Sequence, residues 1–192
     1  MQRNSENNLI VISGPSGVGK DSVITKVRHL DSSLSLSVSA TTRPPRDGEQ
    51  SGSSYHFLSR EVFEQKIQNS EFLEYTEYCG NYYGTFKRPI EKAIKSGRRI
   101  ILKIDVQGAE KVRQIYPGCL SIFILPPSLE SLQERILLRQ LDDSESMQSR
   151  LAQAEEEISH SSSYDFSVVN DTVDACAHKV LNKIYGLEED FE

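Results

Sequence analysis

Cysteine and histidine are scarce in this sequence of 192 residues, and neither type is clustered. The three cysteines are odd in number and have no paired spacing, which argues against a disulfide framework and a zinc site; they are Cys79, Cys119 and Cys176. The four histidines are scattered along the chain, which favours surface or packing roles over metal or catalytic ones. We therefore expect reduced thiols and no metal site built on these two residue types.

Long apolar runs and an excess of positive charge are also absent. The longest apolar runs, such as residues 120–125, are far shorter than a membrane span. The first eight residues are polar and unlike a secretory signal. The 28 acidic residues outnumber the 22 basic ones, and a net charge of −6 disfavours a broad nucleic-acid-binding face. We expect a cytoplasmic protein that binds neither membranes nor nucleic acid.

Near the N-terminus an apolar segment leads into a glycine-rich loop that ends in a lysine. Residues 9–12 are typical of a buried parallel strand, and the apolar spacing over residues 18–30 predicts a helix. The glycines allow the loop to turn its N–H groups toward a phosphate at the helix N-terminus, where Lys20 would reach the outer phosphates. The predicted nucleotide phosphate site comprises Gly14, Pro15, Ser16, Gly17, Val18, Gly19, Lys20, Asp21 and Ser22. A tight strand-to-helix connection without a ligand is the structural alternative.

Strands and helices alternate along the rest of the chain. Strands are expected at residues 35–39, 72–78, 99–106, 120–125 and 166–169. Helices are expected at 61–68, 88–95, 147–160 and 172–185, and from residue 128 to a polar break at 140–146. Residues 40–54 lack a helical period and read as an ordered loop. This alternation predicts an α/β fold with a parallel sheet, flanked by helices and binding ligands at the carboxyl ends of its strands.

Two arginines, Arg43 and Arg46, lie on the proline-containing segment of residues 41–46. Arginine suits bidentate phosphate contacts, and a stiff loop lowers the entropy lost in holding two of them in place. From this segment alone, a second phosphate site and a pair of solvated arginines are both open interpretations.

Several further segments resemble the guanylate kinase family in order and approximate spacing. They are the residues at 37–49, 52, 55–57, 71–74, 80–85 and 104–108, and the resemblance runs from about residue 9 to residues 169–171. It implies a P-loop NTPase-type CORE, an inserted small mixed α/β lobe that binds GMP, and a helical LID over ATP. The expected CORE is 1–37, 89–134 and 161–192, the GMP-binding lobe 38–88, and the LID 135–160.

The resemblance also implies an activity, the phosphorylation of GMP and dGMP by ATP with Mg²⁺ as cofactor. Glu74 matches the guanine-reading carboxylate, which can accept from both N1–H and the 2-amino group of guanine, whereas adenine has an acceptor at N1. The implied GMP-binding residues are Ser39, Arg43, Arg46, Tyr55, Glu74, Tyr83, Thr85 and Asp105. Those implied to take up charge during transfer are Lys20, Arg43, Arg139 and Arg150, while Arg135 and Asn170 would lie near the adenine.

The chain departs from the expected pattern at two positions. Asp21 follows Lys20 where the nucleotide-loop pattern has Ser or Thr, and Lys103 stands where the family often carries a carboxylate. Residues 103 and 105 would share one face of a strand, so Lys103 can pair with Asp21 if that face borders the loop. Alternatively, Asp21 favours the helix N-terminus and Lys103 points to solvent. Asp21 is also a candidate Mg²⁺ ligand.

Two other functions fit the same fold. A non-catalytic guanylate-kinase-like interaction module tends to lose the loop lysine, whereas this chain keeps Lys20. A kinase of another small phosphorylated substrate would not need the guanine-reading set of Ser39, Glu74 and Thr85. The sequence makes no prediction of oligomeric state.

Overall fold

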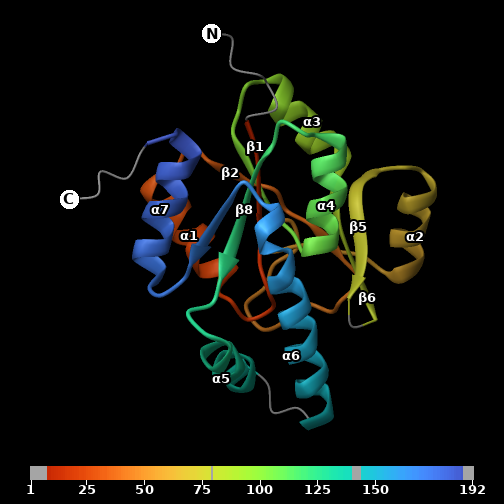
Figure 1. Ribbon diagram of the computed structural model, residues 1–192. Helices are drawn as coiled ribbons and strands as arrows, with labels where there is room; N and C mark the ends of the chain where they lie inside the picture. Colours follow the sequence, from red (N-terminus) through yellow and green to blue (C-terminus); the bar gives the residue numbers. More distant parts are fainter. Residues whose placement is uncertain (1–7, 79, 140–143, 188–192) are drawn as a thin grey trace.

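The main sheet of the computed structural model has five parallel strands (Figure 1). The structure describes residues 8–78, 80–139 and 144–187, and their side chains except those of residues 138, 139 and 144–149. The spatial order of the strands is β2 (Ser35–Leu36), β7 (Ile100–Lys103), β1 (Leu9–Ser13), β8 (Leu120–Leu125) and β9 (Phe166–Val169). The parallel sheet flanked by helices confirms the predicted fold class. Its central strand, β1, leads directly into the glycine-rich loop.

Helices cover both faces of this sheet (Figure 1). Ile10 and Ile12 of β1 pack on the face that carries α1 (Lys20–Leu30) and α7 (Val173–Tyr185). Leu9 and Val11 pack on the other face, beneath α3 (Lys87–Lys95) and α4 (Val106–Ile115). Successive side chains of a strand point to opposite faces, so a strand that is covered on both sides reads as a continuous apolar run. This explains why β1 could be predicted from its sequence.

A second, smaller sheet forms a lobe beside the main one. Its order is β4 (His56–Phe57), β3 (Ala40–Thr41), β6 (Asn81–Phe86) and β5 (Phe72–Tyr78); β3 and β4 pair in parallel, and the other pairs are antiparallel. We refer to this sheet and α2 (Arg60–Gln68) as the small lobe. On the core side, Lys111 of α4 donates a hydrogen bond to the carbonyl of Tyr75 at 2.6 Å. The small lobe is thereby tied to α4.

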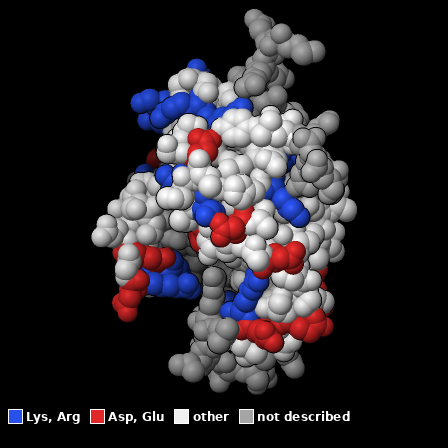
Figure 2. Space-filling model, turned by 90° about the vertical axis from the view of Figure 1, so that its left-hand side faces the viewer, with Lys and Arg blue, Asp and Glu red and all other residues white. Residues whose placement is uncertain are grey.

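Charged side chains are mixed on the molecular surface drawn in Figure 2. Lys and Arg atoms lie among Asp, Glu and uncharged atoms, and neither sign covers a broad continuous area of that face. In the described part of the chain, no helix is both long and apolar enough to cross a membrane. Cys119 and Cys176 are buried, and Cys79 lies outside the described residues.

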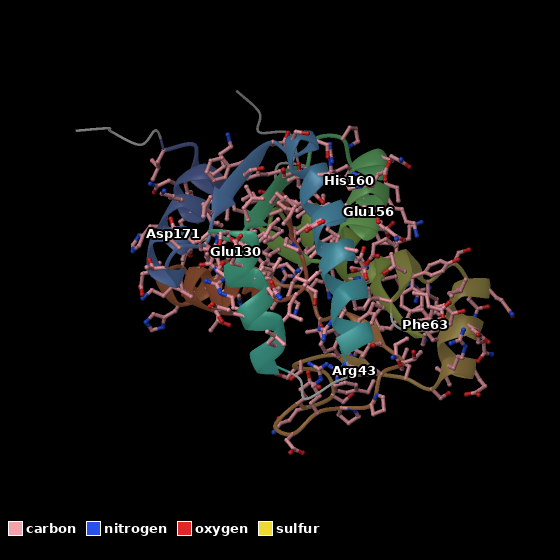
Figure 3. The ribbon with its side chains drawn as sticks, turned by 60° about the horizontal axis from the view of Figure 1, so that its bottom comes forward. Arg43, Phe63, Glu130, Glu156, His160 and Asp171 are labelled. Atoms are coloured by element: carbon pink, nitrogen blue, oxygen red, sulfur yellow. The ribbon has the colours of Figure 1, made fainter. Side chains whose placement is uncertain are left out.

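Aromatic rings form the core of the small lobe. Phe63 of α2 (Figure 3) is fully buried. Its ring stacks on that of Phe72, with centroids 4.3 Å apart, and on that of Tyr82 at 5.2 Å. A Cβ atom on Gly84 would lie 3.0 Å from the ring of Phe63, so a side chain there would push this packing apart. A core with few members depends strongly on each large side chain.

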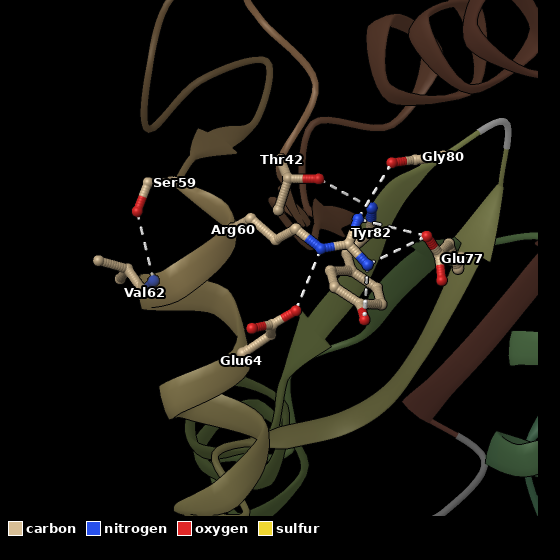
Figure 4. A network of polar contacts seen from close by, with 8 residues as sticks. All are labelled: Thr42, Ser59, Arg60, Val62, Glu64, Glu77, Gly80 and Tyr82. Carbon is tan, nitrogen blue, oxygen red and sulfur yellow. Dashed lines mark hydrogen bonds and ion pairs between the residues drawn. The ribbon is translucent and has the colours of Figure 1, made fainter.

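Arg60 fastens the start of α2 to the hairpin of β5 and β6 (Figure 4). Its guanidinium pairs with Glu64 at 3.1 Å and with Glu77 at 3.3 Å, and it donates to the hydroxyl of Tyr82 at 3.0 Å. The backbone N–H of Tyr82 in turn donates to Thr42 Oγ1 at 2.9 Å. The network joins three segments of the small lobe that are distant in the sequence.

Several element boundaries differ from those predicted. The strand expected at 99–106 ends at Lys103, because the Asp105 side chain accepts from the N–H of Gly108 and begins α4, a helix that the sequence analysis missed. The strand expected at 35–39 ends at Leu36. The supposed loop at 40–54 begins with β3, since two-residue strands carry no readable period. The chain is already helical at 144–146, where a break was expected, because α6 spans Ser144–Ser159.

Candidate active site

Three glycines with positive φ shape the loop between β1 and α1. The angles are 147° at Gly14, 86° at Gly17 and 98° at Gly19. A Cβ atom on Gly14 would collide with the carbonyl oxygen of Ile124, and one on Gly19 would lie 2.7 Å from Asn170 Nδ2. Only glycine meets both the torsional and the steric demand at these positions. The loop therefore approaches the neighbouring strand ends closely.

Lys20 and one loop amide are already partnered by protein oxygens. The Lys20 ammonium donates to the carbonyls of Gly14 and of Pro15, the latter at 3.0 Å. Burial lowers the pKa of Lys20 from 10.5 to about 8, although the charge of Glu157 acts in the opposite direction. Glu157, on α6, accepts a hydrogen bond from the N–H of Ser16 at 3.3 Å. A bound phosphate would replace these partners.

The loop opens into a cleft of about 280 Å³ at the carboxyl ends of β1 and β7. This is the edge of a parallel sheet at which ligands bind. The cleft also reaches the small lobe and α6. Of the site residues predicted from sequence, those that line it are Gly14, Ser16, Gly17, Gly19, Lys20, Asp21, Ser39, Arg43, Arg46, Tyr55, Glu74, Tyr83, Asp105 and Arg150. The structure thus brings the glycine-rich loop and most of the predicted GMP-binding residues together in one cleft.

Glu74 places a buried acid in the cleft. Glu74 is 5% exposed. Burial raises the pKa of its carboxyl group from 4.5 to about 7, and the charge of Asp105 makes a smaller contribution in the same direction. A Cβ atom on Gly108 would lie 2.6 Å from Glu74 Oε2, so the carboxyl group needs a glycine there. Asp105 accepts from the N–H of Gly108 at 2.7 Å and from Thr76 Oγ1 at 2.5 Å. Hydrogen-bond donors on a ligand would favour ionised Glu74.

Arg43 and Arg46 are ordered by Glu49, which the sequence analysis did not single out. One Glu49 oxygen pairs with the Arg43 guanidinium at 2.8 Å, and the other accepts from the N–H of Arg46 at 2.7 Å. The Arg43 guanidinium carbon lies 5.6 Å from the centroid of the Tyr55 ring, which in turn lies 6.1 Å from that of Tyr83. A cation and two phenol groups therefore face the same end of the cleft.

Comparison with known proteins identifies the family. Residues 6–185 match the family model described as guanylate kinase. The chain belongs to the guanylate kinase family. It is 43% identical over 188 residues to a guanylate kinase of Synechocystis sp., covering 98% of both chains, and 45% identical over 180 residues to one of Clostridium perfringens, covering 94% of this chain and 83% of that protein.

A solved structure agrees with this assignment. The crystal structure of guanylate kinase from Anaplasma phagocytophilum superimposes with a TM-score of 0.79 at 33% sequence identity. The match covers 95% of this chain and 86% of that one. The resemblance noted in the sequence is thereby confirmed at the level of family and fold.

Two residues predicted near the adenine brace the phosphate loop of this guanylate kinase family member. Asn170 Nδ2 donates to the carbonyl of Val18 at 2.8 Å, and Arg135 Nη1 donates to the same oxygen at 3.3 Å. Neither residue lines the cleft. Both residues therefore hold the loop in place through the carbonyl of Val18, outside the cleft lining.

The remaining predicted residues outside the cleft lining have other positions. Pro15 and Val18 are buried members of the loop, and Ser22 is exposed on α1. Thr85 is buried on β6 opposite Glu74 in the sheet register. The side chain of Arg139 lies outside the described ones.

The predicted pairing of Lys103 with Asp21 is confirmed. The Lys103 ammonium forms an ion pair and hydrogen bond with Asp21 Oδ1. The supporting assumption that residues 103 and 105 share a strand was wrong, because Lys103 ends β7 and Asp105 caps α4. The two residues meet because β7 lies beside β1, whose loop carries Asp21 into α1.

Several cleft residues were missed as site candidates, and their spacing carries a signal. Thr76 and Tyr78 line the cleft with Glu74, as every second residue of β5 does when one face of a strand borders a site. Glu157 follows Arg150 by seven residues on α6, a spacing of about two helical turns. Both periods were present in the sequence.

The cleft fits a Mg²⁺ ion carried by nucleotide phosphates better than an ion caged by protein. Among the described residues, no three His, Cys, Asp or Glu side chains form a group that could hold a metal. Asp21 offers one carboxylate beside the loop, and its side chain is 71% exposed. Mg²⁺ often keeps several waters and takes one or two carboxylates in addition to substrate phosphates, so this donor set is sufficient.

Proposed function

We propose that this chain transfers the terminal phosphoryl group of ATP to GMP, producing ADP and GDP, and that dGMP is also an acceptor. The single observation that carries the proposal is that the phosphate loop and buried Glu74 line one cleft. A triphosphate bound by the loop and a guanine bound by Glu74 would therefore bring their phosphates toward each other. Positioning of two phosphates accounts for much of phosphoryl-transfer catalysis.

The glycine-rich loop is the proposed ATP site. Its N–H groups and the N-terminus of α1 would surround the phosphates, with Lys20 leaving the loop carbonyls to contact the outer oxygens. Mg²⁺, when bound, would neutralise charge on the phosphate oxygens, with Asp21 as the proposed protein ligand. Arg135 and Asn170 would act on ATP by holding the loop through Val18.

The small lobe supplies the proposed GMP site. An ionised Glu74 would accept from N1–H and the 2-amino group of guanine, while Ser39 would offer a hydroxyl donor toward O6. Thr85, which is buried opposite Glu74 in the sheet, is proposed for the same role as Ser39. AMP would present an acceptor at N1, which a carboxylate cannot satisfy. The GMP phosphate would be bound by the residues that line the same cleft as Glu74, namely Arg43, Arg46, Tyr55 and Tyr83.

The charge that develops on the transferred group would be met by cations from several elements. Lys20 and Arg43 come from the two phosphate sites, and Arg150 comes from α6. Arg139 is proposed for the same role from the sequence resemblance. Closure of the proposed LID and GMP-binding lobe over the CORE would exclude water and reduce unproductive hydrolysis of ATP. The reaction needs no covalent enzyme intermediate.

A coupled assay of ADP formation with ATP and each of GMP, dGMP, AMP, UMP and CMP tests the proposal. We expect turnover with GMP and dGMP, and little with the other three acceptors. Absence of turnover on GMP would contradict the kinase assignment and favour an interaction module. Equal turnover on AMP would contradict the role of Glu74, and preference for an unrelated phosphorylated acceptor would favour the other kinase interpretation. The cytoplasmic location stays a prediction.

A further inference from the structure

Lys103 is a cation at the junction of the two proposed substrate sites, and neither site yet uses it. Its side chain is 18% exposed and lines the cleft. The ammonium pairs with Asp21, which directly follows the loop lysine, and lies 5.2 Å from the centroid of the Tyr55 ring on the small lobe side. One side chain therefore contacts both the phosphate loop and the proposed GMP phosphate site.

The charges around Lys103 favour an anionic ligand. Its positive charge helps to lower the pKa of Lys20, so two ammonium groups face the same partly buried space. Burial would lower the pKa of Lys103 itself, but Tyr55 and Asp21 raise it overall, which keeps the side chain charged at neutral pH. Like charges that converge in a cleft raise the local potential for anions.

The present partner of Lys103 is exchangeable. The Asp21 side chain is 71% exposed, and ion pairs with such an exposed member contribute little free energy. The Arg43 guanidinium lies 5.6 Å from the same Tyr55 ring that Lys103 approaches. A phosphate dianion beside that ring would be within reach of two cations and would compete well with one solvated carboxylate.

We propose that Lys103 binds the phosphate of GMP and that Asp21 holds its ammonium until GMP arrives. This rests on the proposed function, and it adds Lys103 to the residues that contact the acceptor. Asp21 is in this respect a positioning residue, because it acts through Lys103.

The test compares Lys103→Met, Lys103→Arg, Asp21→Ser and the double variant Asp21→Ser/Lys103→Met. Equilibrium titration would give the affinity for GMP and for ATP, and competition against GMP would give the affinity for guanosine, which lacks the phosphate. We expect Lys103→Met to weaken GMP by about tenfold or more, as for loss of a charged hydrogen bond, while guanosine and ATP bind as before. Lys103→Arg should retain most of the GMP affinity.

The Asp21 variants separate phosphate binding from a simple counter-ion role. We expect Asp21→Ser to bind GMP as well as the wild type or better, and to leave the Lys103→Met defect unrescued in the double variant. Lys26→Met is the matched control, because Lys26 pairs with Asp174 at 2.5 Å between α1 and α7 and does not line the cleft.

Three results would overturn the inference. They are unchanged GMP affinity in Lys103→Met, an equal loss for GMP and guanosine, and a GMP defect in Asp21→Ser that matches the one in Lys103→Met. Far-UV circular dichroism and a thermal melt of each variant report that it is folded. If the wild-type chain turns over GMP and one of these results is found, the inference fails and the proposed function stands. If the wild type neither binds nor phosphorylates GMP, the proposed function itself fails.

Discussion

The carboxylate of Glu157 accepts a hydrogen bond from the N–H of Ser16 at 3.3 Å, so a residue of α6 reaches the phosphate loop from 141 positions away in the sequence. Its charge also opposes the lowering of the Lys20 pKa that burial causes. Burial in turn raises the pKa of Glu157 itself. A negative group thus lies at a loop that is proposed to bind a triphosphate, and the two compete for the same amide.

Replacement of Glu157 by Gln should therefore tighten ATP binding. The change removes repulsion between a carboxylate and the phosphates while it keeps the size and hydrogen bonding of the side chain. We expect a several-fold lower Kd for ATP, of the order produced by about 1 kcal/mol, measured by equilibrium titration. Glu156→Gln is the control, because Glu156 is the exposed neighbour on the same helix (Figure 3). Equal effects of both variants would show that only net charge matters.

The raised pKa of Glu74 predicts an acidic limit to GMP utilisation. GMP needs the ionised carboxylate, and the free protein holds it with a pKa of about 7. As pH falls below that value the protonated form dominates, so kcat/KM for GMP should fall by about tenfold per pH unit. The GMP phosphate titrates near pH 6 as well, about as other phosphate monoesters do.

Glu74→Gln separates these two titrations. The variant should lose most of its GMP activity at every pH, and its pH profile should retain only the acidic limb that is due to the substrate phosphate.

The raised pKa also has a consequence for stability, because Glu74 has a pKa near 4.5 in the unfolded protein and about 7 in the folded protein. Ionisation of Glu74 therefore disfavours folding as pH rises through that window, and Glu74→Gln should remove this component from a series of thermal melts.

The lowered pKa of Lys20 predicts an alkaline limit to ATP utilisation. The free protein holds this group with a pKa of about 8, and only the ammonium form can neutralise phosphate charge. Above that pH, kcat/KM for ATP should fall by about tenfold per pH unit, measured at saturating GMP. Lys20→Arg keeps its charge at alkaline pH and should flatten this limb, even if it lowers the maximal rate. A limb that is equally steep in both proteins would assign the titration to another group.

Loss of the Phe63 side chain should weaken the binding of GMP more than that of ATP. It is fully buried in the aromatic core of the small lobe, and removal of a buried Phe side chain costs about 3 kcal/mol or more. We expect Phe63→Ala to lower the free energy of unfolding and to weaken GMP binding, while ATP affinity changes much less. Val62→Ala, an exposed position on the same helix, is the control. Equal losses of GMP and ATP affinity would show that the lobe does not respond separately.

The core elements could be predicted from sequence because their apolar patterns and glycines lie within short stretches of the chain. The strand at Leu9 and the glycines of the loop could be identified from adjacent residues, and so could the helix that follows. The start of α4 was missed because apolar residues continue from β7 past Asp105, whose capping role depends on its side-chain geometry. The contact of Glu157 with Ser16 depends on tertiary packing of α6 against the loop. Glu157 stands among other glutamates, so its residue type alone gave no indication of its position.

The central claim is that the phosphate loop and Glu74 act on two nucleotides in one reaction. Phosphorus NMR of the protein with equimolar ATP and GMP tests this claim most directly, because it resolves each product. The proposed reaction predicts equal amounts of ADP and GDP with little free phosphate. When AMP replaces GMP with the wild-type protein, it predicts no ADP beyond a slow background. Release of inorganic phosphate without GDP, or phosphorylation of AMP as fast as GMP, would contradict it.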